Sequence, residues 1–256
     1  MKYVLFSIVI AAVLFNVACT GVTVKQEFGD HDLSWSYDGE KGPENWGGLK
    51  DEYVRCKTGG SQSPINLTNE KEMGLSPIEF NYVLWKNPKI ENDGHTIRVE
   101  NTSRSYIVIA GKPYQLMQLH FHSPSEHQID GVHLDMEMHL VHKSPDDGQI
   151  AVVAVLFTQG EENKFLKPLW GELSENMGGT KVKGFVDLNT LLPEGRGFLS
   201  YSGSLTTPPC SENVSWSVMS ETVSLSPSQL NKFTSLFGSN ARPIQATNGR
   251  AIGLIE

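Results

Sequence analysis

The chain of 256 residues is 39% hydrophobic, contains 24 glycines and 13 prolines, and carries a formal net charge of -8. Such a chain can bury a full core as one domain, and we find no repeat, low-complexity tract or linker in it. The negative charge, without a block of Lys or Arg, argues against a nucleic-acid partner and against an anionic membrane surface. We therefore expect a small-molecule ligand.

The N-terminus reads MKYVLFSIVIAAVLFNVACTG, which is one Lys, a short apolar run and then small residues. This pattern predicts an export signal over residues 1–18, followed by a flexible segment over 19–34 and no integral membrane domain. Residues 17–19 fit the end of a bacterial lipobox, although Asn16 stands where Leu is usual. A lipid anchor on Cys19, a free periplasmic or secreted form and an uncleaved anchor all stay open.

Two cysteines, Cys56 and Cys210, remain if Cys19 is lipidated or removed. A leftover pair in an exported protein favours a disulfide. The alternative is two unrelated buried thiols.

Several segments alternate apolar and polar residues or are rich in β-branched residues, and clusters of Gly, Pro, Asn and Asp separate them. Both patterns predict β-strands. In chain order the predicted strands cover residues 95–100, 106–111, 114–122, 134–142, 150–157 and 213–219.

Two segments favour helices. In residues 165–179 apolar side chains recur every four positions from Phe165 to Met177, with Pro168 near the start. Residues 226–238 are the clearer case, because Ser226 suits an N-cap, Pro227 the first helical position, Gln229 a capping box and Gly238 the end. The domain is therefore predicted to be mainly β, with a few helices on its periphery.

The segment LHFHSPSEH, residues 119–127, concentrates the chemistry. Side chains two apart on a strand share a face, so His120 and His122 point the same way. His139 lies on another predicted strand, which can pair antiparallel with the first. Three neutral imidazoles on a rigid sheet suit Zn2+, and three protein ligands leave the fourth tetrahedral position open, as in catalytic sites.

Two residues that can hydrogen-bond the ligand histidines on the side away from the metal strengthen the prediction of a zinc site. Gln118 lies two residues before His120 and Glu137 two before His139, so each can accept the spare imidazole N–H. A lone His-x-His pair would more often be structural or exposed. A cupin metal oxygenase also begins with His-x-His and a Glu four residues on, here Glu126, but its glycine belongs six residues before the first His, and here Gly111 is nine before.

At these residues the chain resembles an α-class carbonic anhydrase of the exported bacterial type. The resemblance runs in order through WSYDGEKGPENW, CKTGGSQSPINL, NDGHTIRVE, QLHFHSPSEH, EMHLVHKS, YSGSLTTPPCSENVSW and NARPIQ. It implies a catalytic domain over residues 35–256. The implied fold is a large, mostly antiparallel twisted sheet of about ten strands, with Zn2+ at the base of a cone.

The resemblance also implies roles for further residues. His120, His122 and His139 match the zinc ligands, and the backbone carbonyl of Asn240 orients the ligand that Gln118 and Glu137 do not. Thr206 is expected to donate to Glu126 and to accept from the zinc-bound group, and Thr207 to contact substrate. The apolar wall that receives CO2 is matched by Val141, Val152, Leu205, Val214 and Trp216.

By the resemblance His95 matches the proton shuttle. An imidazole suits that role, because its ordinary pKa is near neutral pH. Beside it, Asp93 and Arg98 depart from the Asn and Gln or Asn that bacterial forms more often carry, which puts shuttle efficiency and inhibitor preference in question. The other histidines have no assigned role and are predicted to be structural or solvent-facing. They are His31, His127, His133 and His142.

The implied reaction is reversible hydration of CO2 to bicarbonate and a proton by attack of zinc-bound hydroxide, with His95 carrying the proton away. By the same resemblance Cys56 and Cys210 form a disulfide that tethers the loop carrying Thr206. Exported bacterial relatives are often homodimers, but no residue here marks a subunit interface, so the oligomeric state stays open. Two other functions stay open: a noncatalytic binding module on the same scaffold, and the cupin oxygenase.

Overall fold

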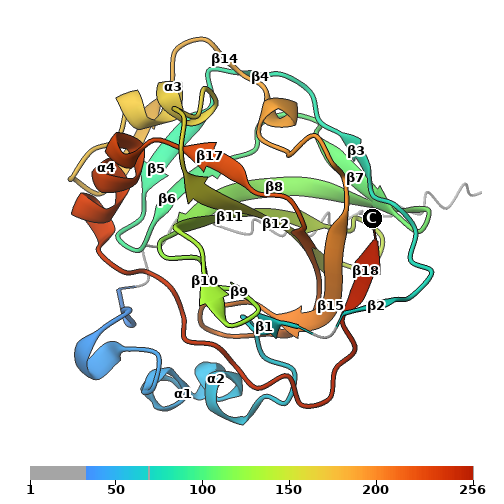
Figure 1. The fold of residues 1–256 in the computed structure, drawn as a ribbon. Coiled ribbons are helices and arrows are strands. Elements are labelled where there is room, and N and C mark those ends of the chain that lie inside the picture. The colour runs from blue at the N-terminus through green and yellow to red at the C-terminus, as the bar shows by residue number, and fades with distance from the viewer. Residues whose placement is uncertain (1–32, 69, 256) are drawn as a thin grey trace, which may run out of the picture. The chain divides into compact units, whose positions relative to one another are not determined.

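A computed structural model describes residues 33–68 and 70–255 (Figure 1). The predicted export signal, Cys19 and His31 lie outside these residues. No helix in the described part of the chain has the length and apolar character needed to cross a bilayer.

A mixed sheet of thirteen strands dominates the described residues, in the order β13-β5-β6-β8-β11-β12-β16-β15-β18-β2 with β3, β7 and β17 attached at the sides. Its strands are β2 (Lys71–Glu72), β3 (Glu79–Asn81), β5 (Lys89–Asn92), β6 (Ile97–Glu100), β7 (Tyr106–Ile109), β8 (Lys112–His122), β11 (Met136–Lys143), β12 (Ile150–Gln159), β13 (Gly178–Lys181), β15 (Phe198–Ser204), β16 (Glu212–Met219), β17 (Val223–Leu225) and β18 (Gly253–Ile255). Most neighbours are antiparallel, and β12 pairs in parallel with β16 and β17, as does β18 with β2. The mainly β, mostly antiparallel prediction is confirmed.

Two small sheets accompany the large one. The first contains β1 (Asn66–Leu67), β9 (Gln128–Ile129) and β10 (Val132–His133), and the second β4 (Trp85–Lys86) and β14 (Phe185–Val186).

All six strands predicted from the sequence are present as β6, β7, β8, β11, β12 and β16, with ends shifted by only a few residues. Their alternating side chains explain why: on β8, for example, Leu119 and Phe121 are fully buried, whereas His120 between them points to the other face. Alternation therefore located the strands that carry the histidines.

The helices are short. They are η1 (Gly39–Lys41), α1 (Trp46–Leu49), η2 (Asp51–Tyr53), α2 (Arg55–Thr58), α3 (Leu166–Gly171), η3 (Leu188–Thr190) and α4 (Pro227–Phe237). The prediction for α4 is confirmed, because Ser226 is its N-cap, Gln229 completes the capping box and Gly238 is its C-cap at φ 61°.

The prediction of a helix throughout residues 165–179 is wrong in its second half. Helix α3 ends at Gly171, and Gly178 and Gly179 belong to β13, which pairs with β5. Gly178 has a φ of 123°, which a helix does not allow and which glycine tolerates. Pairing with the sheet edge thus outweighed the apolar spacing that runs on to Met177.

The two faces of the sheet have different surroundings. On one face, Phe121 packs with its ring centroid 5.0 Å from Trp170 of α3 and 6.4 Å from Phe233 of α4. Both helices lie together beside the sheet (Figure 1). The opposite face has a second apolar cluster that includes Val152 and Trp216. We call these the helix-covered face and the histidine face.

Candidate metal centre

The three predicted ligands converge on the histidine face. His120 and His122 alternate with Phe121 on β8, and His139 on β11 pairs in register with His120. Ring centroids are 5.0 Å apart for His120 and His122, 5.1 Å for His120 and His139, and 4.7 Å for His122 and His139. One ring nitrogen from each lies within 4.8 Å of the other two. That spacing brings three donor atoms around one point.

Each ring directs its other nitrogen at an acceptor. Gln118 Oε1 lies 2.9 Å from His120 Nδ1, the carbonyl of Asn240 lies 2.8 Å from His122 Nδ1, and Glu137 Oε1 lies 2.7 Å from His139 Nε2. Such acceptors hold the N–H on the outer nitrogen, so the inner nitrogen carries the lone pair. His120 Nε2, His122 Nε2 and His139 Nδ1 are thus the inner atoms.

The rings suit a metal electrostatically. Burial lowers the pKa of His120 well below its usual value, and the neighbouring rings of His122 and His139 lower it further. Burial also lowers the pKa of His122, and His122 Nε2 is buried with no hydrogen-bond partner among the described residues. Neutral imidazoles with an unused, buried lone pair are the donors that Zn2+ binds, so the residues present fit that ion.

Glu137 is tied to His127, whose contacts no sequence pattern predicts. His127 is fully buried, with Nδ1 2.7 Å from Glu137 Oε1 and Nε2 2.6 Å from the Tyr201 hydroxyl. Burial opposes the charge on Glu137, but His127 and His139 outweigh it and hold the pKa of this carboxyl well below its usual value. His127 is therefore buried and not solvent-facing, and it anchors the carboxylate that faces His139.

Glu126 is also fully buried, but its contacts differ from those predicted. Oε1 accepts from the backbone N–H of Arg242 at 2.8 Å. Oε2 lies 3.6 Å from His122 Nε2 and has no hydrogen-bond partner among the residues that the structure describes. The predicted donation from the Thr206 hydroxyl to this oxygen is therefore absent.

Arg242 was missed, although the motif NARPIQ contains it. Arg242 is 2% exposed, and its guanidinium donates to Gln62 Oε1 and to the carbonyls of Ser63 and Cys56, at 2.8 to 3.0 Å. It lies 5.6 Å from the Trp46 ring. A buried arginine whose backbone holds Glu126 indicates a structural clamp, which no sequence pattern marks.

The five residues predicted to form an apolar wall all belong to the cluster on the histidine face. They are Val141, Val152, Leu205, Val214 and Trp216. The Trp216 ring lies 4.8 Å from that of His139, and its Nε1 donates to the Ser204 carbonyl at 2.9 Å. The wall therefore reaches the histidines directly.

The loop with Thr206 and Thr207 is fixed at several points. Cys56 and Cys210 form the predicted disulfide. The Cys210 N–H donates to the Thr207 carbonyl at 2.9 Å, and Gln62 Nε2 donates to the Cys210 carbonyl at 3.1 Å. Thr206 is 5% exposed. The disulfide prediction is confirmed, and it joins this loop to α2.

His95 lies half-buried on the turn between β5 and β6. Its ring stacks on Trp35 with centroids 3.7 Å apart, and the Tyr37 ring lies 6.4 Å from both His95 and His122. Burial raises the pKa of Tyr37 well above its usual value, with Glu126 and Asp93 adding to it, and its hydroxyl has no hydrogen-bond partner within the described ranges. Tyr37 thus lies near both His95 and one ring of the triad, a position that sequence spacing does not reveal.

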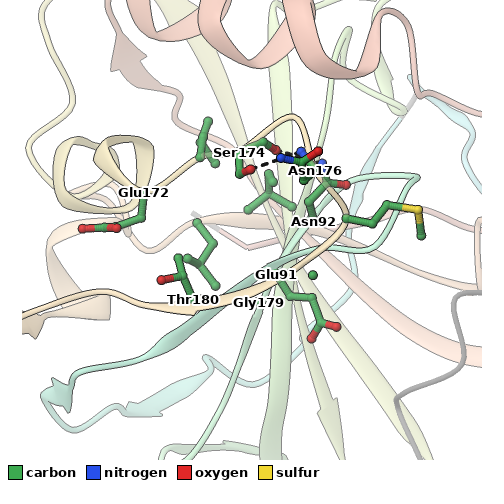
Figure 2. Close-up of a pocket in the computed structure, with 12 residues that line it drawn as sticks. Glu91, Asn92, Glu172, Ser174, Asn176, Gly179 and Thr180 are labelled. Carbon is green, nitrogen blue, oxygen red and sulfur yellow. Dashed lines mark hydrogen bonds between the residues drawn. The ribbon is translucent and has the colours of Figure 1, made fainter.

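The remaining histidines lie apart from the triad. His142 is buried, with Nε2 3.0 Å from the Tyr82 hydroxyl, and burial lowers its pKa to about 3. His133 is exposed on β10. A separate cavity of about 240 Å³ lies beside β5 and β13. Figure 2 shows its lining, where Asn92 Nδ2 donates to the Ser174 carbonyl. Its lining contains none of the predicted site residues.

Comparison with known proteins identifies the family of this arrangement. Residues 41–254 match the model of the eukaryotic-type carbonic anhydrases. A carbonic anhydrase of Klebsiella pneumoniae is 44% identical over 94% of this chain and 96% of its own, and one of Nostoc sp. is 38% identical over 86% and 85%. The structure of the α-carbonic anhydrase of Thermovibrio ammonificans in complex with the inhibitor sulfanilamide superimposes with a TM-score of 0.82, at 43% identity and covering 86% of this chain and 98% of that one.

Proposed function

The chain belongs to the α-carbonic anhydrase family of enzymes, and we propose that it catalyses the reversible hydration of CO2 to bicarbonate and a proton. The observation that carries this proposal is the convergence of three histidine nitrogens within 4.8 Å, each backed by an acceptor on its far side. The cupin alternative is wrong, since the fold and the family are those of carbonic anhydrases. The binding-module alternative lacks support, because all three histidines are present.

His120, His122 and His139 would hold Zn2+ through the inner nitrogens identified above. A bound zinc ion supplies Lewis acidity that brings the pKa of a coordinated water close to neutral pH, a general property of carbonic anhydrases. Gln118, Glu137 and the Asn240 carbonyl keep the ligand rings in the correct tautomer. Ring orientation is thus prepared before a metal binds.

The apolar wall would bind CO2 beside this centre. Val152, Val214 and Trp216 are almost fully buried, and the partly buried Val141 and Leu205 pack against them. These apolar side chains offer CO2 no competing hydrogen bonds. Thr206 and Thr207 supply hydroxyls at the edge of the wall, where they orient the substrate oxygens. The unpartnered Oε2 of Glu126 supplies an acceptor that selects the direction in which the reacting water points its proton.

His95 would remove the proton. Its half-buried ring on the turn before β6 has access both to solvent and to the side of the site occupied by Tyr37. An imidazole suits proton exchange with buffer at neutral pH. The histidine triad and the apolar wall thus serve the hydration of CO2, and His95 serves the release of the proton.

Stopped-flow CO2 hydration with metal analysis tests the proposal. The wild-type protein is expected to contain one zinc per chain and to hydrate CO2, whereas His122→Ala loses both. His133→Ala is the matched control, because that histidine is exposed and outside the triad. A wild-type protein that binds no zinc and hydrates no CO2 would refute the proposal.

We also propose that the chain is exported to the periplasm or secreted, with a lipid anchor on Cys19 as the form to be tested. The disulfide between Cys56 and Cys210 supports export, since such bonds persist in oxidising compartments. Mass spectrometry of the mature N-terminus distinguishes a lipidated Cys19 from a free N-terminus or an uncleaved chain. Light scattering of the purified protein tests the homodimer implied by the resemblance.

A further inference from the structure

Arg98 places a guanidinium beside the histidine triad. On β6 it pairs in register with His120 of β8 on one side and with Glu91 of β5 on the other. Directly paired residues of neighbouring strands point to the same face, so Arg98 lies on the histidine face. Its terminal nitrogens are 3.8 Å from Glu91 Oε2 and 3.7 Å from Asp93 Oδ2, and 15% of the side chain is exposed.

Asp93 connects this guanidinium to the turn that carries His95. Its Oδ1 accepts from the backbone N–H of His95 at 3.0 Å and of Thr96 at 2.9 Å. Its own N–H donates to the Thr96 carbonyl at 3.2 Å. An Asp side chain that binds the N–H groups two and three residues on closes a tight turn. One carboxylate therefore shapes the turn with Oδ1 and faces Arg98 with Oδ2.

Other contacts hold the turn at its remaining positions. Asn92 Oδ1 accepts from the Gly94 N–H at 2.9 Å, while its Nδ2 donates to Ser174 (Figure 2). Asn240 Nδ2 donates to the His95 carbonyl at 3.0 Å. These contacts do not involve the His95 N–H, which donates to the Asp93 carboxylate.

The alternative is that Arg98 only balances the charge of Glu91. Glu91 already has a cation, because Lys89 Nζ lies 2.9 Å from its Oε2. Asp93 has no second cation within ion-pair distance in the described part of the chain. Arg98 is retained there although its Nε is buried without a hydrogen-bond partner among those residues, which is unfavourable. Its contact with Asp93 is therefore the one that only Arg98 provides.

We propose that Arg98 is a positioning residue for His95: its guanidinium holds the Asp93 carboxylate, and Asp93 holds the turn that presents the imidazole. This proposal rests on the proposed shuttle role of His95, but its structural half concerns only residues 93–98. It also gives Asp93 and Arg98, which form an ion pair, a shared role beside His95.

Amide hydrogen exchange by NMR tests the structural half without any metal. In Arg98→Gln the amides of His95 and Thr96 are expected to exchange about fivefold faster, the effect of losing one partly buried ion pair. Asp93→Asn keeps an acceptor oxygen and removes the charge, so it should have a similar effect, and the double variant should match either single variant within about twofold. Glu91→Gln, the control on the other side of Arg98, should leave these amides unchanged.

Kinetics test the functional half. In Arg98→Gln, kcat for CO2 hydration at low buffer should fall about threefold to tenfold, as for a displaced catalytic group. The ratio kcat/KM should not change, and added imidazole should restore kcat, because it replaces the shuttle. A fall in kcat/KM that imidazole does not restore would place the effect of Arg98 at the metal ligands and overturn the proposal.

The exchange rates test the positioning role independently of the shuttle role. Unchanged exchange of the His95 and Thr96 amides in Arg98→Gln overturns the positioning role. If His95→Ala leaves kcat unchanged, the shuttle assignment fails, while faster exchange in Arg98→Gln still supports the link from Arg98 to the turn. The two failures are therefore distinguishable.

Discussion

His139 and His142 lie three residues apart on β11 and are both buried, yet they belong to opposite faces of the sheet. His139 faces the other two triad histidines. Its Nε2 lies 2.7 Å from Glu137 Oε1, and its Nδ1 lies 3.3 Å from His120 Nε2. His142 pairs with Leu116 and Ala151 on the helix-covered face and stacks on Tyr82. Burial alone thus does not mark a ligand. What marks it is a ring nitrogen left facing other ring nitrogens.

Replacing His139 or His142 should give the largest difference in zinc binding between the two faces of the sheet. His139→Ala should lower zinc content and CO2 hydration by about a thousandfold or more, because loss of an outer partner alone costs 10–100-fold. His142→Ala should keep zinc and activity but destabilise the fold by about 2 kcal/mol through the cavity it leaves. Metal analysis, stopped-flow hydration and denaturant unfolding measure these effects. Zinc loss in His142→Ala would contradict the assignment of His139, and not His142, as the zinc ligand on β11.

Acid should destabilise the protein through the helix-covered face. Burial lowers the pKa of His142 to about 3, so the folded state keeps it neutral while the unfolded state protonates it below about 6.5. Its stabilising contribution is therefore complete above pH 6.5 and is lost as pH falls towards 3. Between pH 7 and pH 4 the loss is about 3 kcal/mol. Urea unfolding of the metal-free protein at both pH values measures this loss together with that from His120 and His122, whose pKa values burial also lowers.

His142→Phe supplies the matched comparison for this pH effect. The variant has no titrating group at this position, so its stability should depend less steeply on pH between 7 and 4. His133→Phe is the control for a histidine replaced at an exposed position on β10. Parallel slopes for wild type and His142→Phe would show that His142 does not titrate as the burial argument requires.

On the histidine face, the residues that hydrogen-bond the ligand histidines are expected to differ in their effect on zinc affinity. Glu137 is a charged acceptor to His139 and His127, whereas Gln118 is a neutral acceptor to His120. Charge-assisted hydrogen bonds are about twice as strong as neutral ones. Glu137→Ala should therefore lower zinc affinity by about a hundredfold and Gln118→Ala by about tenfold.

Competition with a chelator measures these affinities. Glu172→Ala is the control, because this carboxylate lines the cavity of Figure 2 and not the triad. Equal losses for Gln118→Ala and Glu137→Ala would mean that the charge of Glu137 contributes nothing to the affinity.

The sequence predicted the parts of this molecule that depend on local periodicity. Alternation on β8 and β11 placed the three histidines on strands, and the spacing of two residues placed Gln118 and Glu137 on the faces of their ligands. The capping residues of α4 are equally local, and that helix begins and ends as expected. The resemblance added Asn240, whose backbone carbonyl faces His122.

The remaining parts depend on contacts between distant segments, which periodicity does not encode. His127 meets Tyr201 across 74 positions, and the Arg242 N–H meets Glu126 across 116. The sequence did not predict this second contact, and the expected bond from Thr206 to Glu126 Oε2 is absent. The end of α3 was misjudged for the same reason, because pairing with β5 takes up Gly178 and Gly179.

The smallest expected effect concerns the helix-covered face alone. Ser226 accepts from the Gln229 N–H at 3.2 Å and caps α4, whose Phe233 ring lies 6.4 Å from Phe121 on β8. Ser226→Ala should destabilise the fold by about 1 kcal/mol, and Ser235→Ala in the same helix should cost less, because its hydroxyl is exposed and only bonds the Lys232 carbonyl. Zinc affinity should not change in either variant, since Phe121 and His122 face opposite sides of β8. A weakened zinc site in Ser226→Ala would show instead that packing of the helices sets the positions of the histidines through β8.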